Sequence, residues 1–385
     1  MKKIILLAPF LISLTHAATV GGFEIESYGF IKASSMYADK ALSSYNNINL
    51  SAPTNATAQT RSQDKTSRMS FQAAQSRLGA YVGKDKVKGH VEFDFIDFAK
   101  SSPAQQMVPR VRIAAISYSW GDGNRINIGQ DWDLFSPTTA YTYDIVGLYF
   151  LAGNTGFMRQ QAQYLKTSGK WEFATALGMA GNNPGVTDND LELGKSPTYS
   201  GRITHQLDNG KVGISAIYST LHYVADGENG TSHDSYGANL FYEKGFSNIM
   251  IKAETYYGQN MANIGTLAIG KGNQFNNVRE FGGMLSANIK TAENQAFFGG
   301  LGLAKVDNKN AITPFALTGT APNVSIKDTG IRSNFLSRVG YEYKITPDFS
   351  WMTEASRYET TTRKSLSSTG TLVAFGLESG VILKF

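Results

Sequence analysis

The sequence ends with a stretch that alternates between two kinds of residue, Thr371-Leu-Val-Ala-Phe-Gly-Leu-Glu-Ser-Gly-Val-Ile-Leu-Lys-Phe385. Counted back from the C-terminus, every second position carries Leu383, Val381, Ser379, Leu377, Phe375 and Val373. The positions between them are small, charged or mixed, and include Glu378 and Lys384. Because successive side chains of a β-strand point to opposite faces, this stretch predicts a strand with one apolar face. Such a final strand is typical of the closing strand of a membrane barrel, although a soluble β-sandwich can also end on one.

The N-terminus has the three parts of a secretory signal peptide. Met1-Lys2-Lys3 is basic, residues 4–14 are apolar, and Thr15-His16-Ala17 offers small residues where a signal peptidase cuts. A membrane-anchoring helix would need about 20 apolar residues, which this segment lacks. We therefore expect residues 1–17 to be a cleavable signal peptide and residues 18–385 to form the exported domain.

The composition fits an exported protein that crosses a membrane without helices. Aromatic residues make up 12% of the 385 residues, with 19 Tyr and 22 Phe, and there are 39 glycines. No later segment reaches roughly 18 uninterrupted apolar residues, the length that indicates a membrane helix. A barrel explains this combination, because half of each strand faces lipid, half faces water, and aromatic residues gather at the membrane interfaces. The absence of cysteine excludes disulfides and thiolate metal sites.

The chain alternates between short polar turns and longer connections. The short turns lie near residues 84–86, 121–124, 167–170, 208–210, 245–248, 291–294 and 346–348. The longer loops cover about 41–67, 100–106, 133–156, 182–195, 225–233, 260–274, 308–325 and 363–369. Seven short turns and eight loops join sixteen strands and leave both termini on the short-turn side. Short turns at one end and long loops at the other are the pattern of outer-membrane barrels.

Most segments between these breaks alternate in polarity. In the segment 171–179, for example, Trp171, Phe173 and Leu177 share one face, whereas Glu172 and Ala174 lie on the other. A soluble sandwich shows similar alternation, but it rarely joins so many long strands in one domain behind a signal peptide. We therefore predict an all-β fold, a transmembrane antiparallel β-barrel of about sixteen strands.

A barrel of this size has an aqueous lumen, and the polar face of its strands lines that lumen. Assigning this face inward predicts eight lumen arginines: Arg77, Arg110, Arg112, Arg125, Arg159, Arg202, Arg332 and Arg338. It also places carboxylates there, among them Glu92, Asp94 and Asp131. Each arginine can be an ordinary wall residue balanced by a neighbouring carboxylate. The other interpretation is a basic wall that guides anions, because rings of Arg or Lys favour anion pores. The first five arginines come from adjacent predicted strands, which favours a shared patch.

The loop at 133–156 differs from the other seven. It is long, rich in aromatic and aliphatic residues, and uncharged apart from Asp133 and Asp144. A loop this apolar must pack against something, either inside the barrel as a constriction or at a subunit interface. We expect it to be the third external loop, folded into the lumen, with Tyr141, Tyr143 and Asp144 at the constriction. Tyr143 and Asp144 would then face the basic wall across the narrowest point.

Several short segments resemble those of bacterial trimeric porins, in particular the DcaP-like group. They are Ser27-Tyr-Gly-Phe-Ile-Lys-Ala33, Gln75-Ser-Arg-Leu-Gly79, Gly89-His-Val-Glu-Phe-Asp94, Arg110-Val-Arg112 and Asn127-Ile-Gly-Gln-Asp-Trp132. The likeness covers roughly residues 24–160 and the C-terminal strand. It implies a sixteen-stranded homotrimer associated with negatively charged small substrates such as dicarboxylates. Many DcaP-like porins also carry an N-terminal coiled coil, which we expect to be missing here, because only Ala18 to Phe23 precede the first predicted strand.

The sequence offers no catalytic or metal-binding constellation. His233-Asp234-Ser235 contains the residue types of a hydrolase triad, but neighbours on a strand point to opposite faces and cannot form one site. There is no Gly-x-Ser-x-Gly motif, and the histidines lack metal-ligand spacing. We therefore expect neither an enzyme nor a cofactor. Signal-peptide removal lowers the formal net charge from +5 to +3, which gives no case for nucleic-acid binding.

Together these features predict an outer-membrane porin for passive diffusion of small hydrophilic solutes, with a preference for anions. Its expected partners are those solutes, outer-membrane lipid, two further copies of the chain, and the barrel-assembly machinery, which would read the C-terminal Phe385. Two alternatives stay open: a structural or host-contact barrel without a conducting pore, and a substrate-specific channel with a saturable binding site.

Overall fold

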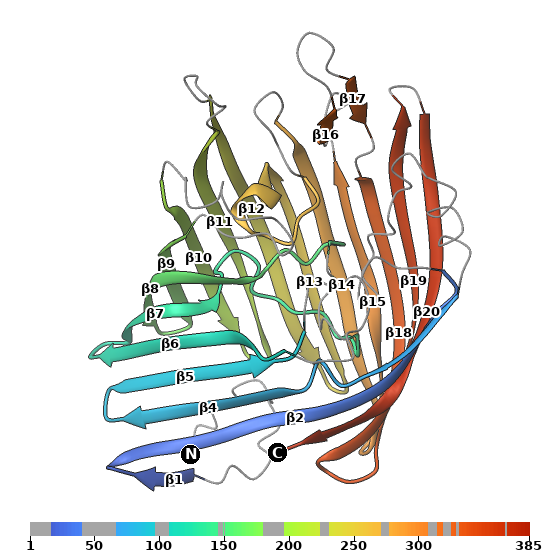
Figure 1. Ribbon diagram of the computed structural model, residues 1–385. Coiled ribbons are helices and arrows are strands. Elements are labelled where there is room, and N and C mark those ends of the chain that lie inside the picture. Colours follow the sequence, from blue (N-terminus) through green and yellow to red (C-terminus); the bar gives the residue numbers. More distant parts are fainter. Residues whose placement is uncertain are drawn as a thin grey trace.

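The chain folds into a closed antiparallel β-barrel (Figure 1). The computed structural model describes residues 17–40, 67–96, 108–144, 149, 151–179, 196–223, 231–270, 277–306, 314–318, 325–328, 331–365 and 368–385. Residues 1–16 of the predicted signal peptide lie outside these ranges. In the described part of the chain, no helix is long and apolar enough to cross a membrane.

Nine strand segments form the first half of the barrel wall and pair in chain order. They are β2 (Phe23–Ala38), β3 (Arg68–Gln72), β4 (Arg77–Lys84), β5 (Val87–Asp94), β6 (Arg110–Trp120), β7 (Asn124–Trp132), β8 (Met158–Ser168), β9 (Trp171–Gly178) and β10 (Thr198–Leu207). The second half follows the same order. It comprises β11 (Gly210–Tyr223), β12 (Thr231–Phe246), β13 (Ile249–Gln259), β14 (Arg279–Ala292), β15 (Gln295–Val306), β18 (Ile331–Lys344), β19 (Phe349–Ser365) and β20 (Ser368–Lys384).

The sheet closes where the last strand meets the first. β20 pairs antiparallel with β2, and Gly29 and Phe385 exchange both backbone hydrogen bonds at the end of this seam. The short β1 (Ala17–Val20) pairs with β2 beyond Phe385, so it continues the position of β20. Since β3 and β4 also share one position, the eighteen segments of the sheet make a sixteen-stranded barrel. The prediction from the terminal stretch is confirmed.

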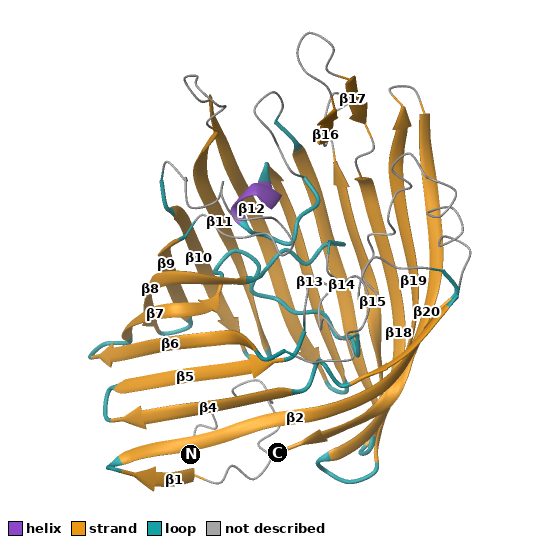
Figure 2. Cartoon of the chain, viewed as in Figure 1, coloured by secondary structure: helices purple, strands orange, loops and turns teal. Residues whose placement is uncertain are grey.

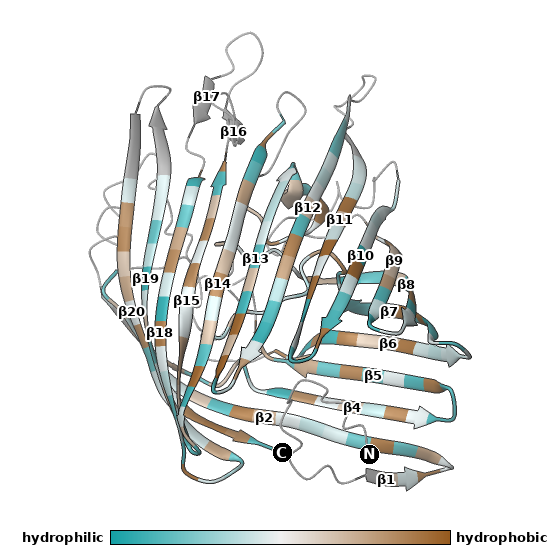
Figure 3. Ribbon diagram, turned by 180° about the vertical axis from the view of Figure 1, so that it is seen from behind, coloured by the Kyte–Doolittle hydropathy of each residue, from teal (hydrophilic) through white to brown (hydrophobic). Residues whose placement is uncertain are grey.

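Burial alternates along the strands as the polarity pattern predicts. In β9, Trp171, Phe173 and Leu177 are exposed on the outside, whereas Ala174 and Ala176 are buried on the inside. Figure 3 shows the same alternation as bands of apolar and polar residues along most strands. The outer surface is therefore the apolar one, which is the reverse of a soluble protein and the arrangement of a barrel in lipid.

All seven predicted short turns join consecutive strands, and the ends of the described chain, Ala17 in β1 and Phe385 after β20, lie at that end of the barrel (Figure 1). Most predicted loops fall partly outside the described residues, but the strands that flank them are in place. Several boundaries differ. β19 and β20 extend into the loop expected at 363–369, because β19 ends at Ser365 and β20 begins at Ser368. The loop expected at 100–106 is longer, because β5 ends at Asp94 and β6 begins at Arg110. β12 begins inside the loop expected at 225–233, and the loop expected at 308–325 contains a hairpin of β16 (Pro314–Thr318) and β17 (Ser325–Asp328).

One strand of the expected sixteen is broken. Between the loop at 41–67 and the turn at 84–86 the sequence predicts a single strand, but β3 and β4 are separated by a turn in which Ser76 N–H donates to Ala73 O at 2.9 Å. The Ser76 hydroxyl accepts the Lys32 N–H at 3.1 Å and so replaces a bond of the ladder. The break turns Gln75 into the barrel, where it is buried.

Candidate functional site

Two arginines and two carboxylates form an ion-pair network on the inner face of β5 and β6. Arg110 and Arg112 are two residues apart and point the same way, as the strand period requires. Arg110 Nε donates to Asp94 Oδ1 at 2.8 Å. Arg112 donates to Glu92 at 2.7 Å and to Asp94 at 3.0 Å. Because each carboxylate is buried and bound to a guanidinium, the network fixes its own geometry.

Arg77 on β4 adds a third guanidinium to this network, which we call the basic wall: Arg77, Arg110 and Arg112 with Glu92 and Asp94. Arg77 Nε lies 3.6 Å from Glu92 Oε1. Among these described groups, three guanidinium groups face two carboxylates, so the wall as defined here carries one more positive than negative charge. The side chains of Arg77 and Arg110 are each 23% exposed, whereas that of Arg112 is 5% exposed. A solute in the lumen can therefore reach Arg77 and Arg110.

Arg159 on β8 is buried away from the basic wall and joins three chain segments. Its Nε lies 2.5 Å from Asp133 at the start of the inward loop. Its Nη1 donates to Met179 O at 2.6 Å, and its Nη2 donates to Ile264 O in the 3-10 helix η2 (Met261–Ile264). Arg159 and Asp133 thus hold the loops together and offer no free charge to the lumen.

The remaining predicted arginines lie elsewhere. Arg202 pairs with Glu172 at 2.8 Å on the inner face near the short turns. Arg125, at the same end on β7, is exposed. Arg332 is half-buried at the loop end of β18. The structure therefore brings together three of the five arginines expected to form one patch.

The loop between β7 and β8 runs through the barrel interior, as predicted (Figure 2). Near its start, Phe135 O accepts hydrogen bonds from Ser215 on β11 and from Asn239 Nδ2 on β12, the latter at 2.9 Å. Glu254 on β13 then accepts bonds from the Ser136 hydroxyl and, at 3.4 Å, from the Thr138 N–H. This half of the loop is fastened to the wall opposite the basic wall.

The tip of the loop binds β18 and β19. Arg338 donates to Asp144 Oδ2 at 3.0 Å and lies 3.6 Å from Glu354. Glu354 also accepts the Thr142 hydroxyl at 2.8 Å and the Tyr143 N–H at 2.9 Å. All of these charged groups are buried, so they act as fasteners. The loop residues 145–148 and 150 lie outside the described residues.

Sequence reasoning missed the contact between the loop and the barrel seam. Lys32 on β2 is buried, pairs with Glu378 on β20 at 2.7 Å and donates to Tyr143 O and, at 2.7 Å, to Gln75 Oε1. Its Nζ also lies 3.7 Å from the centre of the Tyr143 ring. Gln75 in turn donates to Asp144 O at 2.8 Å. The sequence did contain a signal for this contact, because Lys32 lies on the inward face of the first strand and Glu378 lies on the last strand.

The constriction residues therefore differ in orientation from the expectation. Asp144 and Tyr143 make their described contacts with groups other than the basic wall. Arg338 binds the Asp144 carboxylate, because a buried carboxylate requires a cation, and the Lys32 Nζ lies over the Tyr143 ring. Tyr141 is half-buried beneath Lys252, with 4.4 Å between the Lys252 Nζ and the ring centre. Burial raises the pKa of Tyr141 to about 12, so its phenol is neutral at physiological pH. Asp131 accepts hydrogen bonds from Asn127 at 2.6 Å and from the Trp132 N–H at 2.7 Å.

The interior holds no cluster of three or more metal-ligating side chains within the described ranges. Most of the charged groups described above are arginines and carboxylates that pair with each other, and the loop divides the space between them. This arrangement suits the passage of water and small polar solutes along a charged wall.

Comparison with solved structures shows what this fold is similar to. The outer membrane channel DcaP of Acinetobacter baumannii matches with a TM-score of 0.74 at 15% identity, over 96% of this chain and 99% of that chain. An anion-selective porin from Comamonas acidovorans matches with a TM-score of 0.57 at 12% identity, over 94% and 100%. The trimer form of OmpT, an outer membrane protein of Vibrio cholerae, matches with 0.55 at 13%, over 94% and 100%. No protein-family model and no curated protein sequence matches the chain.

These likenesses extend over nearly the full length of both chains in each pair. The chain therefore has the fold of the outer-membrane porins, a sixteen-stranded barrel with a loop folded into it.

Proposed function

We propose that the protein is a porin of the bacterial outer membrane, a water-filled channel through which small hydrophilic solutes diffuse passively, and that it favours anions. The general porin function rests on the closed barrel and its neighbours among the solved structures. The anion preference rests on one observation: the basic wall has three arginines for two carboxylates.

The inward loop supplies the size limit of this channel. It is fastened to β11, β12 and β13 at its start and to β18, β19 and the seam at its tip. We infer that the open path runs between the loop and the basic wall, because Arg77 and Arg110 keep exposed surface there. Anions entering this path meet the surplus charge where the water-filled cross-section is smallest, and low-dielectric walls strengthen that interaction.

The remaining parts of the proposal concern export and assembly. Residues 1–17 direct export and are removed, and Phe385, paired with Gly29 at the seam, serves the barrel-assembly machinery as a terminal signal. The apolar outer face contacts outer-membrane lipid, and three copies assemble, as in the trimer form of the Vibrio cholerae protein. The anion-selective neighbour from Comamonas acidovorans supports the preference for anions. The resemblance to DcaP-like porins implies small organic anions such as dicarboxylates as substrates.

Reconstitution of the purified protein in planar lipid bilayers tests the proposal. We expect steady single-channel conductance in KCl and, in a salt gradient, a reversal potential of the sign set by chloride. Insertion without steady current would overturn the porin function and favour a structural barrel. Saturation of the current at low succinate concentration would instead indicate a substrate-specific channel.

A further inference from the structure

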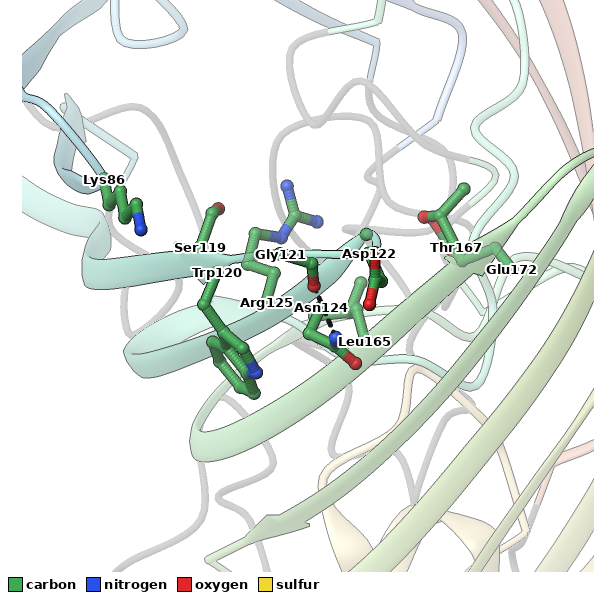
Figure 4. A pocket seen from close by; sticks show the side chains of 11 residues that line it. Lys86, Ser119, Trp120, Gly121, Asp122, Asn124, Arg125, Leu165, Thr167 and Glu172 are labelled. Atoms are coloured by element: carbon green, nitrogen blue, oxygen red, sulfur yellow. Dashed lines mark hydrogen bonds between the residues drawn. The ribbon is translucent and has the colours of Figure 1, made fainter.

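A cavity of about 400 Å³ lies at the short-turn end of the barrel, away from the inward loop (Figure 4). It lies between the turn at Lys86 and the ends of β6, β7, β8 and β9. The backbone register places Ser119 opposite Arg125 and places Arg125 opposite Leu165, so these three side chains share the inner face. The cavity therefore opens on the lumen side of the wall.

Arg125 differs from six of the other predicted lumen arginines in having no carboxylate partner among the described residues. Arg77, Arg110, Arg112, Arg159, Arg202 and Arg338 each lie within 4.0 Å of a carboxylate. No carboxylate of the described residues comes that close to Arg125, and its side chain is exposed. Because a paired guanidinium has its donors occupied, Arg125 is the arginine best able to bind a passing anion.

The other groups of the cavity leave the charge balance positive. Lys86 is a second exposed cation in the lining. Glu172 also lines the cavity, but Arg202 neutralises it at 2.8 Å. Asp122 in the β6–β7 turn is the remaining carboxylate. Within the described lining, two cations and one carboxylate thus have no ion-pair partner, and the hydroxyls of Ser119 and Thr167 add hydrogen-bond donors.

We propose that this cavity is an anion-binding site at the periplasmic mouth, where Arg125 and Lys86 receive the carboxylate or phosphate groups of small solutes leaving the pore. The site rests on the proposed porin function and extends it from one charged constriction to two successive sites. Two weak sites in series favour conduction, because a solute must bind well enough to enter and weakly enough to leave.

Block of the KCl current by succinate tests the site. Succinate is added to each chamber in turn, and its residence time in single wild-type channels is compared with that in Arg125→Gln. In Arg125→Gln, we expect the residence time of succinate added to one chamber to shorten about threefold, which is the effect of one exposed charge contact. The residence time of succinate added to the other chamber should stay unchanged. Lys244→Gln is the matched control, because Lys244 lies at the same end of the barrel but on the outer face of β12.

A chemical rescue separates charge from shape at this position. The chain has no cysteine, so Arg125→Cys carries a single thiol. Modification with 2-aminoethyl methanethiosulfonate restores a positive charge and should restore the long residence, whereas the 2-sulfonatoethyl reagent should not. Equal residence times in wild type, Arg125→Gln and both modified forms would overturn the site while leaving the porin function intact. Absence of steady current from the wild-type protein would overturn both.

Discussion

The two halves of the lumen use the same residue types in different ways. On the side of β11–β14, β18 and β19, charged groups are buried and bind the inward loop, as Arg338 binds Asp144 and Glu254 binds Ser136. On the side of β4–β6, the groups bind each other, and Arg77 and Arg110 keep exposed surface. The first half shapes the channel and the second presents charge to solutes.

This difference teaches how to interpret an arginine in a barrel. An inward position alone does not identify a selectivity residue, because Arg159 and Arg338 are inward and fully engaged in holding loops. We infer that surface exposed to the lumen is the property that marks a selectivity residue. By this criterion we propose that Arg77, Arg110 and Arg125 are the groups that solutes meet.

The largest effect is expected from Arg338→Ala, in the half of the lumen whose charged groups bind the inward loop. It leaves Asp144 and Glu354 buried without their cation, which costs about 3–5 kcal/mol and should release the loop tip. Single-channel conductance should therefore rise and the current should become noisy. Arg357→Ala is the matched control, since Arg357 points outward from β19 and pairs only with Glu359 in the described structure. Unchanged conductance in Arg338→Ala would refute the fastening role.

Glu254→Gln should loosen the start of the same loop, with a smaller effect than Arg338→Ala has on its tip. The amide keeps an acceptor but replaces one carboxylate oxygen that receives the Ser136 hydroxyl or the Thr138 N–H, at a cost of about 1–3 kcal/mol. We expect more frequent brief openings with the main conductance retained. Thr255→Val, on the outer face next to it, should leave the gating pattern unaltered. A gating pattern in Glu254→Gln identical to that of wild type would show that this anchor is dispensable.

Arg110→Gln, in the half of the lumen formed by β4–β6, should change the ion selectivity and leave the shape of the channel intact. Arg112 still binds both Glu92 and Asp94, so the wall keeps its geometry while it loses one positive charge. The ratio of anion to cation permeability should drop severalfold, measured by reversal potential, and the conductance should change little. High salt should shrink the difference, because the screening length falls from about 10 Å at 0.1 M to about 3 Å at 1 M.

The smallest effect is expected outside the lumen. Lys170 and Asp208 form an exposed ion pair between two short turns, with 2.9 Å between the charged atoms. Such pairs contribute about 0–1 kcal/mol, so Lys170→Gln should alter neither thermal stability nor conductance measurably. A loss of selectivity in this variant would mean that charge anywhere at this end governs permeation, which would remove the distinction between the two halves.

The fold could be predicted because its determinants are local. The two-residue period of the strands and the seven turn sequences gave the strand count, and Thr371 to Phe385 closed the barrel where expected. Even the inward loop was predictable, since an apolar loop must be covered. The break between β3 and β4 was not, because it depends on Ser76 bonding to a strand more than 40 residues away.

The site could be predicted only in part. Alternation assigns Arg110 and Arg112 to one face, but it cannot say which carboxylate each meets or how exposed each stays. Those properties depend on the path of the loop across the lumen. The contacts of Asp144 and Lys32 could not be predicted either, because their partners, Arg338 and Glu378, lie far away in the sequence.

The reversal potential in a KCl gradient, recorded for the wild-type protein and for Arg110→Gln under the same conditions, tests the central claim most directly. The surplus charge of the basic wall predicts a chloride-favouring potential in the wild type and a value shifted toward zero in Arg110→Gln, at similar conductance. A wild-type potential that favours potassium, or one that Arg110→Gln leaves unchanged, would contradict the account.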